Sequence, residues 1–293
     1  MERWEIEVRE DTNPSMARVV IAGEWKGDPI KAKQLLEDIC KKWPKGTKVK
    51  FLITCGGFIQ FDWPEFISPK DIDDNKNPNK EVIDALVKEA EKCVESVLNG
   101  GLDKKLGEFT DYITLGIDSY KKKISTTKNY LNQPHIELVF LKDLKKGNLY
   151  WTGKSYPTTG QEKGLIRIAN LETHFLDLDI GKVMILGCHD LTIFNPRSKN
   201  ATGWRREVND KFKELAQKEQ PIYVLHHPHT TVKKKTWLLA WYGLIKTLSS
   251  IKEYAGAGTY YEPNRKSSEW DNLNEVLKST KNTPTIDFII WIK

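Results

Sequence analysis

Two short apolar runs separated by a helical stretch constrain the fold of this chain most strongly. RVVIA at residues 18–22 and VKFLIT at residues 49–54 are typical of buried strands. Between them, Asp28 and Pro29 open a helix, and residues 43–46 end it. Apolar side chains recur at helical spacing along this helix, namely Ala32, Leu35, Leu36, Ile39 and Cys40. A strand–helix–strand unit of this kind predicts a layered α/β fold.

Further strands and helices follow along the chain. We expect strands at residues 112–117, 136–141, 149–153, 165–169, 174–178, 182–186, 222–225 and 286–292, and helices at 80–99, 204–217 and 237–248. A run of strands between two strand–helix regions predicts two sheets packed on each other and covered by helices. Hydrophobic residues make up 39% of the 293 residues, which is enough for a large core.

Composition excludes several classes of protein. No apolar run approaches the roughly 18 residues that a membrane span needs, and the charged N-terminus lacks a signal region. We therefore expect a cytoplasmic protein with no membrane partner. The four cysteines show no CxxC spacing, so we expect reduced thiols. The net charge of +6 is mild, so a nucleic-acid partner is not expected.

The most informative segment is LDLDIGKVMILGCHDLTIFNPR, at residues 176–197. A turn at Ile180 and Gly181 leads into a buried strand that ends at Gly187 and Cys188. A glycine beside the cysteine lets a ligand approach the backbone, and a strand end is a frequent place for a nucleophile. A cysteine after an apolar strand is also a common inert core residue, so this spacing alone leaves both interpretations open.

The same segment resembles the nitrilase, or carbon–nitrogen hydrolase, superfamily. Members carry a Gly-Lys-hydrophobic strand that ends in Cys-x-Asp, followed by an aromatic residue, a proline and an arginine. The matching residues here are Gly181, Lys182, Cys188, Asp190, Phe194, Pro196 and Arg197. One departure is Asn195 before Pro196, where the family usually has Pro-Glu.

A second segment strengthens this resemblance. The family places a catalytic lysine after an aromatic-rich strand and a further glutamate eight residues later. Here Lys154 follows Tyr150 and Trp151, and Glu162 lies at 162 − 154 = 8 residues beyond it. The resemblance implies a single four-layer α-β-β-α domain over residues 1–293, no cofactor, and a homodimer or higher homo-oligomer acting on a small molecule.

The resemblance also assigns roles. It implies Cys188 as a nucleophile that attacks an amide or nitrile carbon, with Lys154 stabilising the charge that develops. Glu162 is then a residue that orients the others. The family expects a third catalytic residue, a glutamate, after the second strand, but Gly57 stands there. The next Pro-Glu ends at Glu65, eight residues further on, and is the candidate replacement if its loop folds back.

Four of the six histidines, His189, His226, His227 and His229, fall close together in the sequence. We expect His189, Asp190, His227 and His229 to line the substrate pocket, and we expect no metal. A zinc or iron site built from the same residues is the competing interpretation, because imidazole and carboxylate groups bind these metals.

The functional hypotheses follow in order. The first is a cysteine-dependent hydrolase of a small amide or nitrile, weakened by the missing glutamate. The second is a catalytically inactive relative that uses the pocket for binding or assembly. The third is a divergent metal-dependent phosphoesterase, although Glu24, Trp25, Lys26, Gly56 and Gly57 stand where most of its ligands belong.

Overall fold

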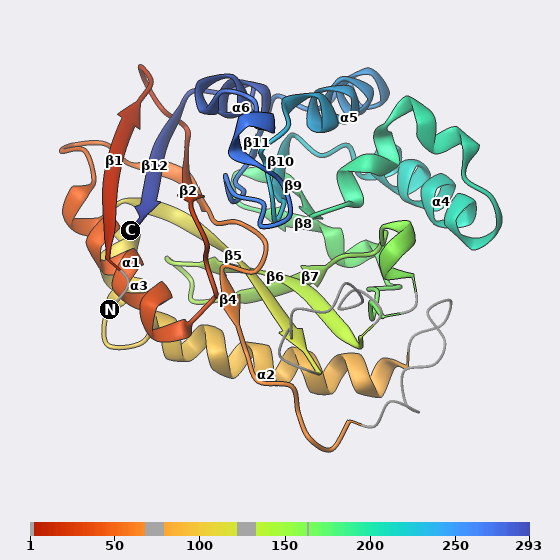
Figure 1. The fold of residues 1–293 in the computed structure, drawn as a ribbon, viewed down its shortest axis with the longest axis horizontal. Coiled ribbons are helices and arrows are strands. Elements are labelled where there is room, and N and C mark those ends of the chain that lie inside the picture. Colours follow the sequence, from red (N-terminus) through yellow and green to blue (C-terminus); the bar gives the residue numbers. More distant parts are fainter. Residues whose placement is uncertain (1–2, 68–78, 122–132, 163) are drawn as a thin grey trace.

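The larger sheet positions half of the candidate site. The structure, a computed structural model, describes residues 3–67, 79–121, 133–162 and 164–293. Among these, the eight strands of the larger sheet are β1 (Trp4–Glu10), β2 (Met16–Ala22), β3 (Val49–Ile53), β4 (Ile59–Gln60), β5 (Thr110–Tyr120), β6 (His135–Asp143), β7 (Leu149–Gly153) and β12 (Thr285–Ile292). The order is β1-β12-β2-β3-β5-β6-β7, with β4 paired to β5 (Figure 1). The β12-β2-β3-β5 stretch is parallel, whereas β1, β6 and β7 pair antiparallel.

The smaller sheet positions the other half. Its described strands are β8 (Phe175–Leu178), β9 (Gly181–Gly187), β10 (Tyr223–His227) and β11 (Glu253–Gly256), in the order β11-β10-β9-β8. β9, β10 and β11 run parallel, and β8 forms an antiparallel hairpin with β9. Because β9 and β10 are parallel neighbours, the residues that follow their carboxyl ends meet at one edge of the sheet. Cys188 and His229 are such residues.

Helices cover the outer faces of both sheets. They are α1 (Pro29–Lys42), α2 (Lys80–Leu98), α3 (Leu102–Gly107), α4 (Gly203–Glu219), α5 (Lys234–Thr247) and α6 (Leu273–Ser279). Short 3₁₀ turns occupy Thr159–Gln161, Leu171–His174, Asp190–Phe194, Pro196–Asn200 and Ser267–Glu269. α1 begins where the Asp28 side chain accepts hydrogen bonds from the backbone N–H groups of Ile30 and Lys31, with Pro29 in the first helical position.

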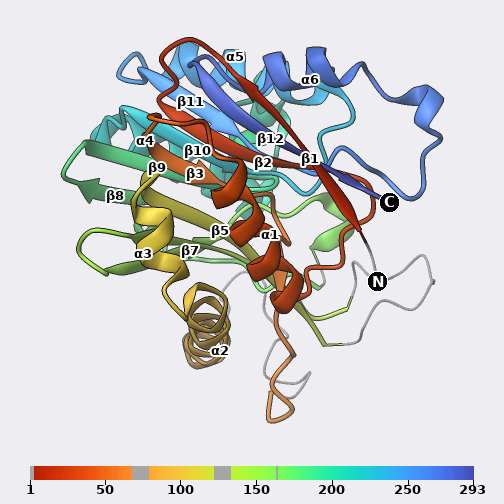
Figure 2. The same cartoon turned by 90° about the vertical axis from the view of Figure 1, so that its left-hand side faces the viewer.

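Three of the four apolar clusters of described residues define the layers. One joins α1, α2 and α3 to the larger sheet and includes Leu35, Leu86 and Leu52. Another joins α4 and α5 to the smaller sheet, and a third fills the space between the two sheets. Figure 2 shows α2 and α3 on one side of the molecule and α5 and α6 on the other. The predicted α-β-β-α sandwich is therefore confirmed, while a single domain over the whole chain stays a prediction.

Two local predictions differ from the structure. Residues 165–169 do not form a strand. Leu165 makes an isolated bridge to His135, and the backbone N–H groups of Leu165, Ile166 and Ile168 donate to three separate carbonyls, those of Gln161, His135 and Lys154. β1 was not predicted, although Trp4, Ile6 and Val8 alternate with charged residues and pack on the core as an edge strand. Among the described residues, no helix has the length and apolar character to cross a membrane.

Candidate functional site

Cys188 lies half-buried directly after β9, at the edge where the two sheets meet. Gly187 makes a close backbone approach possible, since a Cβ there would lie 3.1 Å from the Lys154 Cα. The Asp190 carboxylate holds this turn by accepting backbone N–H groups of Gly187, Ser155 and Tyr156 at 2.8–3.0 Å. Asp190 therefore fastens the cysteine turn to the segment that follows Lys154.

Lys154 follows β7 and is almost completely buried beside Glu137 of β6. Its Nζ lies 3.0 Å from Glu137 Oε1 and 2.9 Å from Oε2, and it donates to Gln161 Oε1 at 2.6 Å. Burial disfavours the ammonium, but the Glu137 carboxylate outweighs burial and raises the pKa of Lys154. Burial likewise opposes the Glu137 charge, but Lys154 and His229 lower the Glu137 pKa to about 2. Both side chains are therefore charged at neutral pH.

A second ion pair lies beside the first. His229, two residues beyond β10, places its Nε2 2.6 Å from Asp118 Oδ2 of β5 and its Nδ1 3.6 Å from Glu137 Oε2. The backbone N–H of His229 donates to the Cys188 Sγ at 3.4 Å. Burial opposes a charge on this imidazole, but Asp118 and Glu137 outweigh burial and raise the His229 pKa well above its usual value. His229 therefore carries a proton at neutral pH.

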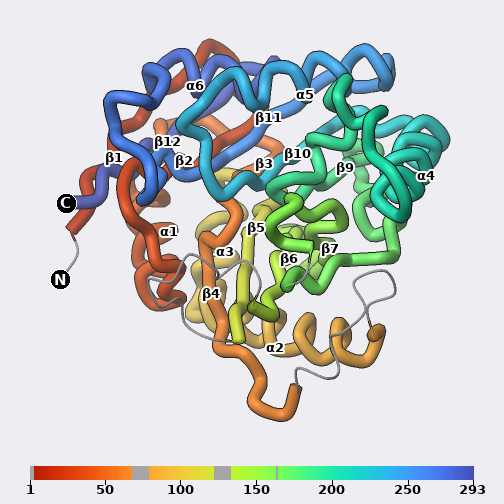
Figure 3. The backbone as a smooth tube through the Cα atoms, turned by 45° about the vertical axis from the view of Figure 1, so that its right-hand side comes forward, coloured from red at the N-terminus to blue at the C-terminus, as the bar shows by residue number. Residues whose placement is uncertain are grey.

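The two carboxylates are direct neighbours, because Asp118 and Glu137 face each other in the β5–β6 ladder. Facing residues of this kind hold their Cβ atoms about 4.5–5.5 Å apart, and like charges there destabilise a sheet. Lys154 and His229 offset the repulsion with one cation for each carboxylate. Figure 3 shows β5, β6 and β7 side by side with β9 and β10 next to them, the arrangement that brings these groups to Cys188.

The remaining histidines differ from His229 in their roles. His226 Nε2 donates to the Cys188 carbonyl at 3.0 Å, and His227 Nδ1 donates to the Thr54 carbonyl at 2.8 Å. Burial lowers the pKa of His226 to about 3 and that of His227 to about 4, so both are neutral. Burial, then the Lys154 charge, lowers the His189 pKa to about 4. Within the described residues, no three His, Cys, Asp or Glu side chains are grouped to hold a metal ion.

The two predicted glutamates lie apart from the Lys154–Glu137 pair. Glu162 forms an ion pair with Arg205 at 2.8 Å, and its neighbour Gln161 contacts Lys154 instead. Glu65 is exposed, and it takes part in none of the described hydrogen bonds or ion pairs that join Lys154, Glu137 and His229.

Asp118, Glu137 and Gln161 did not emerge from the sequence as site residues. The signal available for Asp118 and Glu137 is a single acidic residue inside an otherwise apolar strand, ITLGIDSY for the first and HIELVFL for the second. A buried charge of this kind needs a partner, and it is therefore a marker of an ion pair or a functional site.

The other thiols differ from Cys188 in their surroundings. Burial raises the pKa of Cys40, Cys55 and Cys93 to about 11, so these three groups stay neutral and weakly nucleophilic at physiological pH. Cys188 is the thiol that lies beside the two ion pairs.

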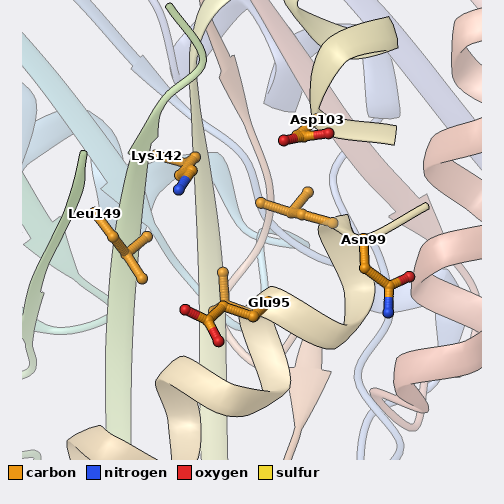
Figure 4. Close-up of a pocket in the computed structure, with 7 residues that line it drawn as sticks. Glu95, Asn99, Asp103, Lys142 and Leu149 are labelled. Atoms are coloured by element: carbon orange, nitrogen blue, oxygen red, sulfur yellow. The ribbon is translucent and has the colours of Figure 1, made fainter. Parts of the chain in front are cut away.

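A small cavity of about 120 Å³ lies elsewhere, between α2, α3, β6 and β7. Figure 4 shows Glu95 and Asn99 of the α2 end near Lys142 and Leu149 of the two strands. Lys142 is five residues from Glu137 and Leu149 is five residues from Lys154. That separation corresponds to about 16 Å along a strand, so this cavity is separate from the Cys188 site.

The family resemblance predicts a glutamate at the position of Gly57, but a side chain there would require neighbouring atoms to shift. Its φ is +65°, and a Cβ there would lie 2.9 Å from Asp118 Oδ2 and 3.4 Å from His229 Cδ2. Gly56 is equally close, since its Cβ would lie 3.0 Å from His229 Nδ1. The His229 ring therefore packs against two residues that lack side chains.

Gly57→Ala should destabilise the protein more than Gly46→Ala. Gly46 is a matched control, because its φ is +76° and a Cβ there would meet nothing within 4 Å. The left-handed conformation costs alanine about 1–2 kcal/mol at either position. The contact with Asp118 at Gly57 adds about 1–3 kcal/mol. Urea unfolding of both variants measures the difference, and equal losses would show that the space around Gly57 adapts freely.

Comparison with known proteins gives structural neighbours only. No family model matches the chain, and no curated protein matches it. One similar solved structure is a cysteine-to-alanine mutant of the Nesterenkonia AN1 amidase from the nitrilase superfamily, with 14% identity, coverage of 85% of this chain and 78% of that chain, and a TM-score of 0.46.

A glutamate-to-glutamine mutant of the amidase from Nesterenkonia sp. AN1, with acrylamide joined to the active-site cysteine by Michael addition, is 14% identical. It covers 83% of this chain and 78% of its own, with a TM-score of 0.47. A cysteine-to-serine mutant is 12% identical over 85% and 79%, also with a TM-score of 0.47. At this level of similarity, we derive the chemistry from this chain's own residues.

Proposed function

We propose that this protein is a cysteine-dependent hydrolase of a small carbon–nitrogen bond, an amide or a nitrile. The observation that carries the proposal is the position of the Cys188 thiol at a strand end beside the buried Lys154–Glu137 and His229–Asp118 pairs. A buried cation next to a thiol favours the thiolate, which is the attacking form of cysteine. Buried ion pairs that shift the pKa values of their members are a marker of functional sites.

The chemistry assigned to the site follows from these charges. Sγ of Cys188 attacks the substrate carbon, and the carbonyl oxygen or nitrile nitrogen gains negative charge. Lys154, held by Glu137 and Gln161, is the cation proposed to stabilise that charge. From an amide, the amine then leaves with a proton. From a nitrile, the thioimidate first adds water and then releases ammonia. In both cases water hydrolyses the resulting thioester to regenerate the thiol.

Other side chains have supporting roles in this proposal. Asp190 and His226 position Cys188 through its neighbouring backbone, and His227 fixes the end of β3 through the Thr54 carbonyl. Glu162 acts as a positioning residue, because it holds Arg205 in an ion pair. Burial and the Lys154 charge lower the pKa of His189, and the Arg205 charge adds a smaller effect in the same direction. His189 is the proposed substrate contact among these groups.

Ammonia release from small aliphatic amides and nitriles tests the proposal. We expect turnover by the wild type and none by Cys188→Ala, because the attacking atom is gone. Cys93→Ala is the matched control, since Cys93 is a partly buried thiol on α2, and this variant should keep full turnover. Mass spectrometry should also find a thioester adduct on Cys188 during turnover.

Two results would contradict this function. Turnover that survives Cys188→Ala would remove the cysteine-hydrolase interpretation altogether. Amides that bind the wild type without ammonia release would instead support the second hypothesis, a catalytically inactive binding protein.

The expected homo-oligomer stays a prediction. Leu238, Tyr242 and Ile245 are exposed on α5, at spacings of four and three residues that place them on one face. A second copy of the chain covering this face is the proposed reason for its apolar character.

A further inference from the structure

We infer that the His229–Asp118 pair is the acid–base partner of Cys188 and takes the place of the carboxylate that Gly57 cannot supply. This inference rests on the proposed function and adds to it the group that moves the proton. Its basis is the arrangement of three side chains from three separate parts of the chain, namely β5, the segment after β9 and the segment after β10.

The space around Gly57 is the first argument. A side chain at residue 57 would begin where the Asp118 carboxylate and the His229 ring now lie, at 2.9 and 3.4 Å. The imidazole therefore occupies the region into which a glutamate at that position would project. Gly56 also makes room, because a Cβ there would lie 3.0 Å from both Nδ1 and Cε1 of His229. Two consecutive glycines are what this ring position requires.

The hydrogen bonds of His229 are the second argument. Nε2 donates to Asp118 Oδ2 at 2.6 Å, which fixes the ring and leaves Nδ1 for other groups. After Asp118 and Glu137, Cys188 is also among the groups that favour the charged imidazole. The backbone N–H of His229 also contacts Sγ, at 3.4 Å. A nucleophile contacting a base that a third group orients is the recurrent arrangement of nucleophilic catalysis.

The other candidate bases fit less well. Both Glu137 oxygens lie within 3.0 Å of the Lys154 Nζ, and Oε1 also accepts a hydrogen bond from Gln161, so this carboxylate is the ion-pair partner of Lys154. Lys154 and His229 lower the Glu137 pKa to about 2 against the effect of burial, which makes it a weak base. Glu65 is exposed. His189 follows Cys188 directly, and burial and the Lys154 charge lower its pKa to about 4, which makes its imidazole a weak base.

The groups that face His229 determine whether its imidazole is protonated. Asp118 of β5 and Glu137 of β6 are the carboxylates, and Cys188 and the neutral Cys55 thiol are the sulfur groups. Burial works against a charged imidazole, and the two carboxylates outweigh it, so the His229 pKa lies well above its usual value. In the resting site His229 therefore holds a proton, and a cation beside a sulfur favours the thiolate, the attacking form of cysteine.

His229 gives up one proton and regains one during the proposed reaction. The thiolate forms an S–C bond as the carbonyl π bond opens, and the imidazolium passes its proton to the nitrogen of the breaking C–N bond. The amine leaves, and the neutral imidazole accepts a proton from water as the oxygen attacks the thioester. When the S–C bond breaks, the carboxylic acid leaves as its anion and the imidazolium–thiolate pair is restored.

Alkylation of Cys188 by iodoacetamide tests the pairing without any substrate. Peptide mass spectrometry follows the rate from pH 5 to pH 10 in the wild type, His229→Gln and Asp118→Asn, with the Cys93 peptide as the control in each sample. His229→Gln keeps the backbone N–H that contacts Sγ, so it isolates the ring. Asp118→Asn removes the charge of Asp118 but keeps its shape, so this second variant is expected to disturb the fold little. Circular dichroism checks that both variants are folded.

We expect the Cys188 rate at pH 6.5 to fall about tenfold or more in His229→Gln, because a cationic neighbour shifts thiolate formation by one pH unit or more. Asp118→Asn should shift the rate in the same direction, and the Cys93 rate should not change. Unchanged Cys188 profiles in both variants would overturn the inference.

Turnover separates this inference from the proposed function. If the wild type hydrolyses amides, His229→Gln should lower kcat about 100-fold or more, the usual contribution of a general acid–base group. Turnover that depends on Cys188 but not on His229 would overturn the inference and leave the function standing. A His229-dependent alkylation profile in a protein without turnover would support the pairing and remove the hydrolase function.

Discussion

Replacing Arg18 with methionine should lower the free energy of unfolding by about 3–5 kcal/mol, the usual cost of leaving one member of a buried ion pair alone. Arg18 is fully buried in β2, and Nε and Nη2 each lie 2.7 Å from a different oxygen of Asp287 in β12. Its remaining donors bind Gly256, Thr280 and Leu277, so all five N–H groups have partners.

The Arg18→Met effect should also depend on pH. Burial raises the pKa of Asp287, but Arg18 outweighs burial and lowers it below 3.8. Asp287 therefore stabilises the wild type above its unfolded pKa, and this contribution is lost as the pH falls through the lower folded pKa. In the variant, the Asp287 carboxyl loses its closest cation and takes up a proton more easily. The stability difference should shrink in acid.

Urea unfolding at pH 7 and pH 3 measures both effects. Arg18→Met/Asp287→Leu is the matched control, because removing both charges costs less than removing one. A loss below about 1 kcal/mol at pH 7 would show that the pair does not carry the expected energy.

Local patterns predicted most of the fold, and the cases that failed show why. The helix with Leu35 and Leu36 could be predicted from apolar residues spaced three and four apart. The strand at Val183 could be predicted from the apolar residues next to it in the sequence. The burial of Arg18, at the start of RVVIA, could not be predicted from the local sequence, because its partner Asp287 is 269 residues away. Residues 165–169 are apolar enough for a strand, but strand formation needs a neighbouring ladder, which their own sequence does not specify.

The candidate site divides in the same way. Cys188 could be predicted as a candidate because it follows an apolar strand and a glycine, and Lys154 because the family resemblance implies a lysine after an aromatic-rich strand. An acidic residue inside an apolar strand marks Asp118 and Glu137 individually, but their proximity could not be predicted, since it depends on the β5–β6 register. The position of Gly57 shows the same limit: the family resemblance predicts a carboxylate there, but only the structure shows that the Asp118 carboxylate and the His229 ring lie against that glycine.

Lys154→Met should remove both stability and turnover, and a double variant can separate the two losses. Lys154 is about 2% exposed, and methionine would leave the buried Glu137 without its closest cation. We expect a loss of about 3 kcal/mol or more in urea unfolding. Turnover should fall about 100- to 1,000-fold, the effect of removing one donor that stabilises developing charge.

Lys154→Met/Glu137→Gln is the control for this prediction. Glutamine keeps the shape of Glu137 and can still hydrogen-bond Gln161, but it leaves no unpaired buried charge. We expect this double variant to regain most of the stability and none of the turnover, because the cation beside Cys188 is still absent. Recovered turnover together with recovered stability would show that Lys154 supports the fold alone, and that the charge stabilising the reaction comes from another group.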